Sequence, residues 1–286
     1  MIYTLYYRNF LKYCNYTCEY CPFKKFKVSE TKIEKEIKYL DMFYKYLKSQ
    51  KDEFKIFIAP KGESLIFHHF KKFCIDLNKL DNIKEVVIQT NLTTDLKFLD
   101  SIDNKKLKLW ITYHPTQVNL EKFINKIKIL VSKNIDFSIG CVGVKENFNE
   151  IKELKLQLDN INLYLGKKIY LWINAYKDEK SYYSKDDIKF LNKIDMYFDI
   201  NLNNYSNKNK PCATNYNAFM IDANGDIRRC YKDNKKLGNL YVNDLKNLSE
   251  IKNCNKNICT CFIGYNNIQN LNLDKVYKKS VLARIP

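Results

Sequence analysis

Short apolar runs alternate with longer segments of helical periodicity up to about Asn201. Runs such as KIFIA and EVVIQ are apolar at nearly every position, which is typical of strands that are covered on both faces. Each strand-like run is followed by a helical segment, so the pattern predicts six β–α units and a parallel sheet with right-handed crossovers. The predicted strands are Tyr3–Tyr7, Phe54–Ala59, Val86–Thr90, Leu107–Tyr113, Phe137–Val142 and Ile169–Asn174. The predicted helices are Glu30–Ser49, Ser64–Leu80, Leu96–Ile102, Leu120–Ser132, Asn147–Leu158 and Ser184–Ile194.

The pattern changes after Asn201. The segment NNYSNKNKP is typical of a linker, and the remainder is rich in Cys, Asn and Gly. The stretch AFMIDANGDIRRC predicts a β-hairpin, because Asn224–Gly225 is a turn pair between two strand-like runs. We therefore predict two domains, covering residues 1–204 and 205–286.

The net charge of +17 arises from 49 Lys and Arg against 32 Asp and Glu. The lysines are spread along the whole chain with acidic residues between them, which indicates a general compositional bias. A nucleic-acid partner is therefore not expected. No stretch of apolar residues is long enough to span a membrane, and no signal peptide is evident at the start. We expect a soluble cytoplasmic protein without a membrane partner.

Ten cysteines in a reducing compartment favour metal or redox chemistry over disulfides. Cys14, Cys18 and Cys21 form the spacing C-x3-C-x2-C directly after the first predicted strand. Three soft thiolates at this spacing suit an iron–sulfur cluster that leaves one iron open to a small molecule. The alternatives are a zinc knuckle or buried free thiols. A tetrahedral zinc site needs a fourth Cys or His, and none lies close in sequence.

The segment CNYTCEYCPF resembles the cluster-binding loop of the radical S-adenosylmethionine (radical SAM) superfamily, whose pattern is C-x3-C-x-aromatic-C. Tyr20 occupies the aromatic position. The resemblance implies an α/β fold, a partial (βα)6 TIM-like barrel, with a [4Fe–4S] cluster on Cys14, Cys18 and Cys21. SAM would chelate the open iron. The segments KGESL, IQTNL, TYHP, VGVKE, LWINA, RRCY and CTCFIGY resemble a group of short, mostly uncharacterised bacterial radical SAM proteins.

Barrel enzymes carry their sites at the carboxyl ends of the strands, and candidate residues follow strands two and three. Gly62 and Glu63 resemble the last two residues of the family's Gly-Gly-Glu motif, which receives the ammonium group of SAM. Lys61 replaces the first glycine. Thr90 and Asn91 are candidates for hydrogen bonds to the ribose or carboxylate of SAM. The structural alternatives are a carboxylate at a helix N-terminus for Glu63 and a turn cap for Asn91.

Further candidates follow strands four to six. Tyr113 and His114 end strand four, and His114 could bind substrate, move a proton or be structural. The stretch Gly140–Gly143, including Val142 and Gly143, resembles the family segment that packs along the adenine. Its glycines would let the backbone approach a flat ring. Asn174, with Trp172, could contact adenine or substrate, although a tryptophan in a strand is more often core.

A second set of cysteines lies beyond the predicted linker. Cys212-x12-Gly225-x4-Cys230 resembles the opening of the SPASM and twitch extensions, which hold auxiliary iron–sulfur clusters. Cys212 and Cys230 would be two ligands, and the resemblance favours the shorter twitch form. The other two ligands would come from Cys254, Cys259 and Cys261. A structural zinc site is the alternative. Cys74 and Cys141 stand apart and are expected to be buried thiols.

The resemblance implies reductive cleavage of SAM to a 5′-deoxyadenosyl radical, which abstracts hydrogen from a substrate. A flavodoxin or ferredoxin would supply the electron. The substrate is either a small molecule or a ribosomally made peptide. Because the first strand begins at residue 2, we expect no N-terminal leader-binding module, which favours the small molecule. A non-catalytic iron–sulfur sensor or electron carrier and a zinc-stapled nucleic-acid binder are the other classes of protein that fit.

Overall fold

The computed structural model spans the chain, and it describes all residues except 24–26, 167, 178–180, 215, 251–252 and 261. Cys261, a predicted cluster ligand, therefore lies outside the described residues. No helix in the described part of the chain is long and apolar enough to cross a bilayer.

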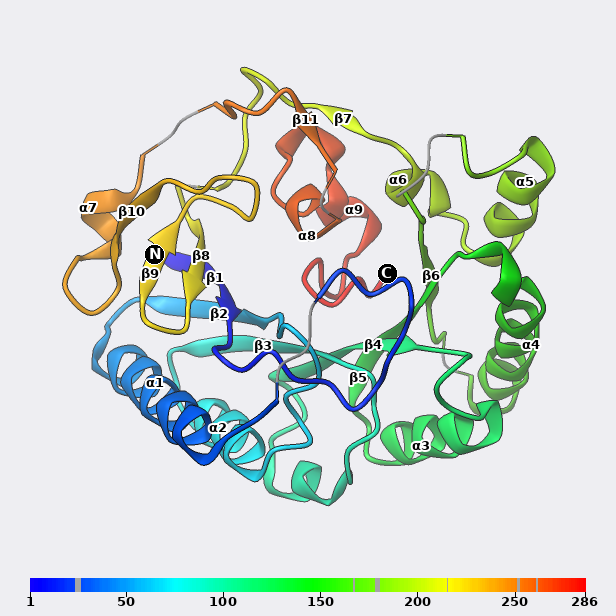
Figure 1. Ribbon diagram of the computed structural model, residues 1–286, viewed down its shortest axis with the longest axis horizontal. Coiled ribbons are helices and arrows are strands. Elements are labelled where there is room, and N and C mark those ends of the chain that lie inside the picture. The colour runs from blue at the N-terminus through cyan, green and yellow to red at the C-terminus, as the bar shows by residue number, and fades with distance from the viewer. Residues whose placement is uncertain (24–26, 167, 178–180, 215, 251–252, 261) are drawn as a thin grey trace.

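One curved sheet dominates the structure (Figure 1). Its six central strands are parallel and lie in chain order, which confirms the predicted parallel sheet. They are β1 (Ile2–Arg8), β2 (Glu53–Ile58), β3 (Ile83–Thr90), β4 (Leu107–Tyr113), β5 (Asp136–Val142) and β6 (Leu171–Asn174). The carboxyl ends of these strands meet at one edge of the sheet, where the site residues were expected.

The longer helices cover the outer side of the curved sheet (Figure 1). They are α1 (Glu30–Ser49), α2 (His68–Asn78), α3 (Leu120–Ser132) and α4 (Phe148–Leu165), with α5 (Lys185–Ile194) following β6. The helix predicted from Ser64 begins four residues later, because the loop before it is held by the Glu63 carboxylate. The helix predicted over 96–102 is a 3-10 helix, Lys97–Ser101, and α4 continues past the predicted end at Leu158 until Gly166, whose φ is 59°.

The two faces of the sheet carry different cores, because successive side chains of a strand point to opposite faces. On the outer face, Tyr7 of β1 stacks on Phe43 of α1 with 4.5 Å between ring centroids. On the inner face, Phe57 stacks on Trp110 at 5.0 Å, and Trp110 meets Trp172 edge-on at 5.1 Å. Trp172 is 2% exposed, so its role is that of a core residue.

The C-terminal segment fills the hollow of the curved sheet (Figure 1). It carries the short helices α8 (Phe262–Tyr265) and α9 (Leu273–Val276). The fully buried Arg284 guanidinium lies 5.0 Å from the rings of both Trp110 and Trp172 and donates to Asn201 Oδ1 over 2.6 Å. Ser138, near the start of β5, donates to the carbonyl of Ala283. The interior is therefore occupied by protein toward the amino ends of the strands.

A hairpin from the second predicted domain extends the same sheet. β8 (Ala218–Asp222) pairs with β1 in parallel, and β9 (Asp226–Arg228) pairs with β8 antiparallel through the turn at Asn224–Gly225. Gly225 has a φ of +87°, a left-handed conformation that favours glycine at this turn.

The remaining elements are β7 (Tyr205–Ser206), β10 (Lys236–Asn239), β11 (Ile258–Cys259), α6 (Phe198–Leu202), α7 (Leu245–Leu248) and the 3-10 helices Lys145–Asn147 and Gln269–Leu271. The division into 1–204 and 205–286 stays a prediction.

Glu36 makes the stability of this fold depend on pH. It is fully buried in α1 and accepts the backbone N–H of Leu11 over 2.6 Å. Burial raises its pKa from 4.5 to about 7. Between these values the folded chain holds a proton that the unfolded chain has lost, so the free energy of unfolding falls as pH rises through this window.

We expect Glu36→Gln to remove that fall. The difference in unfolding free energy between the variant and wild type should shift in the variant's favour by about 2 kcal/mol as the pH rises from 5 to 8. Urea denaturation at each pH measures it. Glu34→Gln, an exposed carboxylate on the same helix, is the control and should gain almost nothing. Equal pH profiles for wild type and Glu36→Gln would contradict the assignment.

Candidate active site at the carboxyl ends of the strands

The loop that carries the first three cysteines follows β1 and lies against the residues after β2. The backbone N–H of Glu63 donates to the carbonyl of Tyr13 over 2.8 Å. Gly62 has a φ of +144°, and a Cβ built on it would lie 1.9 Å from the Tyr13 oxygen and 3.2 Å from Cys14 N. Glycine is therefore required at position 62 for this close approach. Lys61, the residue before this glycine, leaves the contact intact.

Asn9 anchors the beginning of the same loop. Its amide donates to Leu11 O over 2.7 Å and to Ser64 Oγ over 3.1 Å, while its oxygen accepts the N–H of Lys61 over 3.0 Å. Asn9 is 5% exposed, so these bonds lie away from water. The cysteine loop is thus tied to the β2 loop at both its start and its centre.

A second set of polar contacts ties the cysteine loop to the end of β3. Asn91 donates from Nδ2 to Asn15 Oδ1 over 3.1 Å, and Asn15 donates to Thr93 Oγ1 over 3.1 Å. Asn91 Nδ2 also lies 3.8 Å from Cys14 Sγ, and the N–H of Tyr16 lies 3.4 Å from the same sulfur. Two donors therefore point at Cys14, which suits a sulfur that carries negative charge.

His114 holds the far side of the loop from the end of β4. Its Nδ1 lies 2.8 Å from the Tyr20 hydroxyl and 3.4 Å from Cys18 Sγ. The Tyr20 ring is nearly parallel to the imidazole, and Tyr16 meets it edge-on. Burial raises the pKa of the Tyr20 hydroxyl, so this group stays protonated. The structure brings His114 and Tyr20 together with the first cysteine set.

Glu63 is buried beneath this loop and is held on both oxygens. It accepts the N–H of Leu65 over 3.0 Å, the hydroxyl of Thr90 over 3.0 Å and the N–H of Asn91 over 2.5 Å. Burial raises its pKa to about 7, against the lowering effect of these bonds. Glu63 joins the β2 loop to the end of β3, and the SAM contact predicted for it and for Thr90 remains a prediction.

Tyr113 does not face the interior. It lies on the outer face of β4, 2% exposed, with its ring 4.8 Å from that of Phe123 in α3. Because Tyr113 follows Trp110 by an odd number of positions, the pleat turns it to the helix side. Its prediction as a cofactor-binding side chain does not fit this position, and we leave it out of the proposed site.

The two glycines of the β5 segment make room for protein side chains. A Cβ at Gly140 would lie 2.1 Å from the Trp172 indole, so the flat ring beside Gly140 is a tryptophan of the core. A Cβ at Gly143 would lie 2.9 Å from both Ile173 and the Tyr183 hydroxyl, which donates to the Gly143 carbonyl. Packing of the protein accounts for both glycines.

Val142 and Asn174 remain candidates at the end of the sheet. They are register partners on β5 and β6, and both are partly exposed. Each is an even number of positions from an inner-face residue, Gly140 and Trp172 respectively, so the pleat directs both toward the interior. Their contact with SAM stays a prediction.

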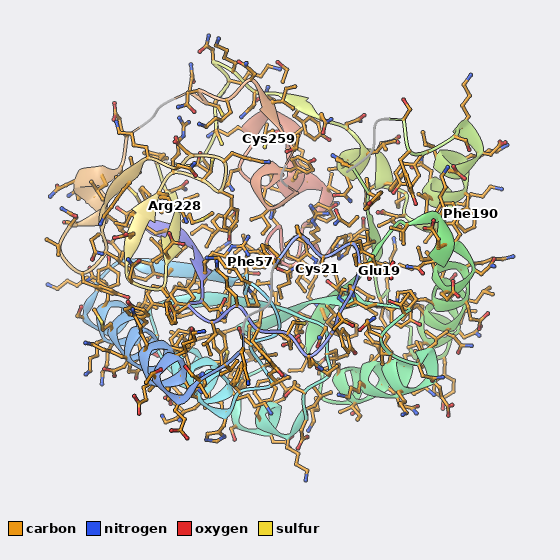
Figure 2. All side chains as sticks on the ribbon, viewed as in Figure 1. Glu19, Cys21, Phe57, Phe190, Arg228 and Cys259 are labelled. Carbon is orange, nitrogen blue, oxygen red and sulfur yellow. The ribbon has the colours of Figure 1, made fainter. Side chains whose placement is uncertain are left out.

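The second cysteine set lines one pocket beside the hairpin. Cys212, Cys230, Cys254 and Cys259 are all among its lining residues. They come from three segments of the chain, with Cys254 and Cys259 in the same one. Burial raises the pKa of the Cys230 thiol. Figure 2 shows Cys259 near β11 and well separated from Cys21, which lies over the middle of the curved sheet. Cys74 and Cys141 are fully buried elsewhere, as predicted.

The donors at both places fit a cluster in their chemistry. Among the described residues, no three His, Cys, Asp or Glu side chains converge on a single metal ion. A cube binds each thiolate to a different iron, so its ligands are spread around a cluster rather than around one ion. At the first place, Cys14, Cys18 and Cys21 are partly exposed on one loop with hydrogen-bond donors beside them. These residues would hold a [4Fe–4S] cluster, and the four pocket cysteines would hold a second.

Sequence reasoning missed several residues that shape this site. Lys126 of α3 donates to the carbonyls of Leu92, Thr93 and Thr94 over 2.7–2.8 Å and so fixes the loop after β3. Gln117 accepts the N–H of Thr17 over 2.9 Å. Neither residue has a distinctive sequence signal. Arg8 could have been identified from the sequence. It is a charged residue at the end of β1, two positions after Tyr6, so its side chain lies on the same inner face of the sheet as that of Tyr6.

No protein-family model matches the chain, and no curated protein matches it. A solved structure of hexahistidine-tagged anSMEcpe with bound AdoMet is similar, with a TM-score of 0.59 and 17% identity over 88% of this chain and 81% of that one. The likeness shows the fold. Native anSMEcpe with bound AdoMet and Kp18Cys peptide gives a TM-score of 0.58 at 17% identity, over 88% and 81% of the two chains. BtrN with AdoMet and 2-DOIA gives 0.40 at 16% identity, over 99% and 92%.

Proposed function

We propose that this chain is a radical SAM enzyme. The observation that carries the proposal is the position of Cys14, Cys18 and Cys21 on one loop across the carboxyl ends of β1 to β4, tied there by Gly62, Asn91 and His114. The fold shared with anSMEcpe supports it, because that protein was solved with AdoMet bound. A [4Fe–4S] cluster on these thiolates would supply one electron to the SAM sulfonium and so release a 5′-deoxyadenosyl radical.

The protein's own residues would position the cofactors and keep water out. Asn91 and the N–H of Tyr16 donate toward Cys14, which stabilises a thiolate at that position. Tyr16 and Leu92 are buried beside the loop and limit access of water to it. Gly62 and Glu63 would receive the methionyl end of SAM, and Val142 with Asn174 would meet its adenosyl end. The substrate would then lie in the remaining interior space, within reach of the transferred hydrogen.

We further propose an auxiliary cluster in the pocket lined by Cys212, Cys230, Cys254 and Cys259, with Cys261 as the alternative fourth ligand. The support is that four thiols from three segments of the chain line one pocket. A [4Fe–4S] cluster at each site would give about eight irons per chain after anaerobic reconstitution. We expect Cys230→Ala to lower this to about four, and an unchanged iron content would contradict the second site.

A small-molecule substrate is the first choice, with an electron from a flavodoxin or ferredoxin in the cytoplasm. A peptide substrate is the second candidate, because anSMEcpe of the same fold was solved with the Kp18Cys peptide. A sensor or electron carrier without catalysis would bind a cluster and leave SAM intact.

The experiment that tests the enzyme proposal uses the reconstituted wild-type chain under anaerobic conditions with SAM and dithionite. We expect 5′-deoxyadenosine to form, detected by liquid chromatography and mass spectrometry. Iron-loaded protein that forms none would favour the electron carrier. A colourless protein with stoichiometric zinc would contradict both.

A further inference from the structure

Three cations gather on the inner face of the sheet between the two sets of cysteines. Arg8 ends β1, Arg228 ends β9, and Lys61 follows β2. Arg8 and Asp222 are register partners, and Asp222 accepts from Arg228 over 2.5 Å. Alternation along the strands places Arg8, Asp222 and Arg228 on the inner face of the sheet. The residue before each of them, Tyr7, Ile221 and Ile227 respectively, lies in the outer core.

Arg8 is fixed in place by two carbonyls of the β2 loop and by two aromatic rings. Its Nη1 donates to the carbonyls of Ala59 and Pro60 over 3.0 and 3.4 Å. Its guanidinium lies 5.4 Å from the Phe23 ring and 4.2 Å from the Tyr231 ring. Phe23 stands two residues after Cys21, and Tyr231 follows Cys230 and lines the second cysteine pocket. Arg8 therefore lies between the two sites.

The charges of this group do not balance. Lys61 is half-buried and, within the described residues, its ammonium makes no hydrogen bond or ion pair. Burial lowers its pKa, Asp222 raises it, and the positive charges of Arg8, Lys12 and Arg228 lower it further. Glu36 is a second acidic neighbour, and the Lys61 charge lowers the pKa of that carboxyl. The Nε of Arg228 is buried and has no hydrogen-bond partner among the described residues. A partly buried excess of positive charge is costly unless an anion neutralises it.

We propose that Arg8, Lys61 and Arg228 form a subsite for an anionic group of the substrate, a phosphate or a carboxylate. The inference rests on the proposed function and narrows its substrate class to anionic molecules. Arg8 and Arg228 present planar N–H donors that suit such a group, and Lys61 adds a point charge. Figure 2 shows Arg228 on the β9 side of the curved sheet and Cys21 near its middle.

The test measures anion binding to the reconstituted holoprotein by calorimetry, with inorganic phosphate in one arm and acetate in the other. We expect one site that prefers one of these two anions, and Lys61→Met should weaken binding by about tenfold or more. Lys51→Met, an exposed lysine before β2, is the matched control and should bind as wild type does. Equal affinities of wild type and Lys61→Met would overturn the proposal.

A second measurement needs no variant. Trace acetylation of the wild-type holoprotein, read by peptide mass spectrometry, should slow by about fivefold at Lys61 when the preferred anion saturates the site, and should stay unchanged at Lys51. Equal protection of both lysines, or of neither, would overturn the subsite.

Saturation with SAM separates the substrate from the cofactor. If the subsite serves the substrate, the anion still binds when SAM is present. If SAM abolishes anion binding, the cations hold the carboxylate of SAM and the proposal is wrong. Formation of 5′-deoxyadenosine is scored separately, so protein that cleaves SAM but binds neither anion overturns this subsite alone.

Discussion

Gly62→Ala is expected to remove the cluster from the first cysteine site. The new Cβ would lie 1.9 Å from the Tyr13 carbonyl oxygen, a backbone atom that cannot move without moving Cys14. The φ of +144° is also strained for any residue with a side chain. We expect the free energy of unfolding to fall by about 3 kcal/mol, iron content to fall by about half and SAM binding to be lost.

Gly166→Ala separates backbone strain from the close contact. Gly166 ends α4 with a φ of +59°, and a Cβ there would meet no other atom within 4 Å. This variant should lose about 1 kcal/mol and keep its full iron content. The comparison uses urea denaturation, iron analysis and calorimetry with SAM. If Gly62→Ala loads iron and binds SAM as Gly166→Ala does, the contact between the β2 loop and the cysteine loop is not what positions the thiols.

Cys14→Ala should abolish SAM cleavage. Two remaining thiolates would not hold a cube, and the donors from Asn91 and Tyr16 would lose the sulfur to which they point. We expect formation of 5′-deoxyadenosine to fall by at least about a hundredfold, because the electron donor to SAM is lost with the cluster.

Cys74→Ala is the matched control. It removes a thiol that is fully buried in α2, far in sequence from both cysteine sets. The variant should lose about 1–2 kcal/mol of unfolding free energy through a small cavity, while its SAM cleavage is retained. Both variants are compared in the same anaerobic assay at equal protein concentration. Cleavage by Cys14→Ala at the wild-type rate would contradict the role of the first cysteine set.

The parallel sheet could be predicted from the sequence because its strands are apolar on both faces and each is followed by a periodic helix. EVVIQ falls within β3, KIFIA reaches one residue beyond the end of β2, and the strand bounds differ from the prediction by few residues. The end of α4 was harder to predict from the sequence. Its terminator is Gly166, whose left-handed conformation depends on the local chain rather than on hydrophobic period.

The site was predictable only where residue types are distinctive. Cysteine spacing identified the first loop, and scarcity of histidine drew attention to His114, which lies beside Cys18 and Tyr20. The prediction that Tyr113 binds a cofactor does not fit its position. His114 faces the cysteine loop, whereas the side chain of Tyr113 points to the opposite, outer face of the sheet. The glycines at 140 and 143 pack against Trp172, Ile173 and Tyr183, contacts between distant segments that no local pattern encodes. Arg8 and Lys126 act through contacts of the same kind.

The most direct test of the central claim is electron paramagnetic resonance of the first cluster with and without SAM. Cys230→Ala is the suitable protein, because it should retain the first cluster alone. After reduction with dithionite we expect a [4Fe–4S]⁺ signal whose line shape changes when SAM is added, saturating at one SAM per chain, because SAM binds the open iron. A [4Fe–4S]⁺ signal that SAM leaves unchanged, or the absence of such a signal from iron-loaded protein, would contradict the account.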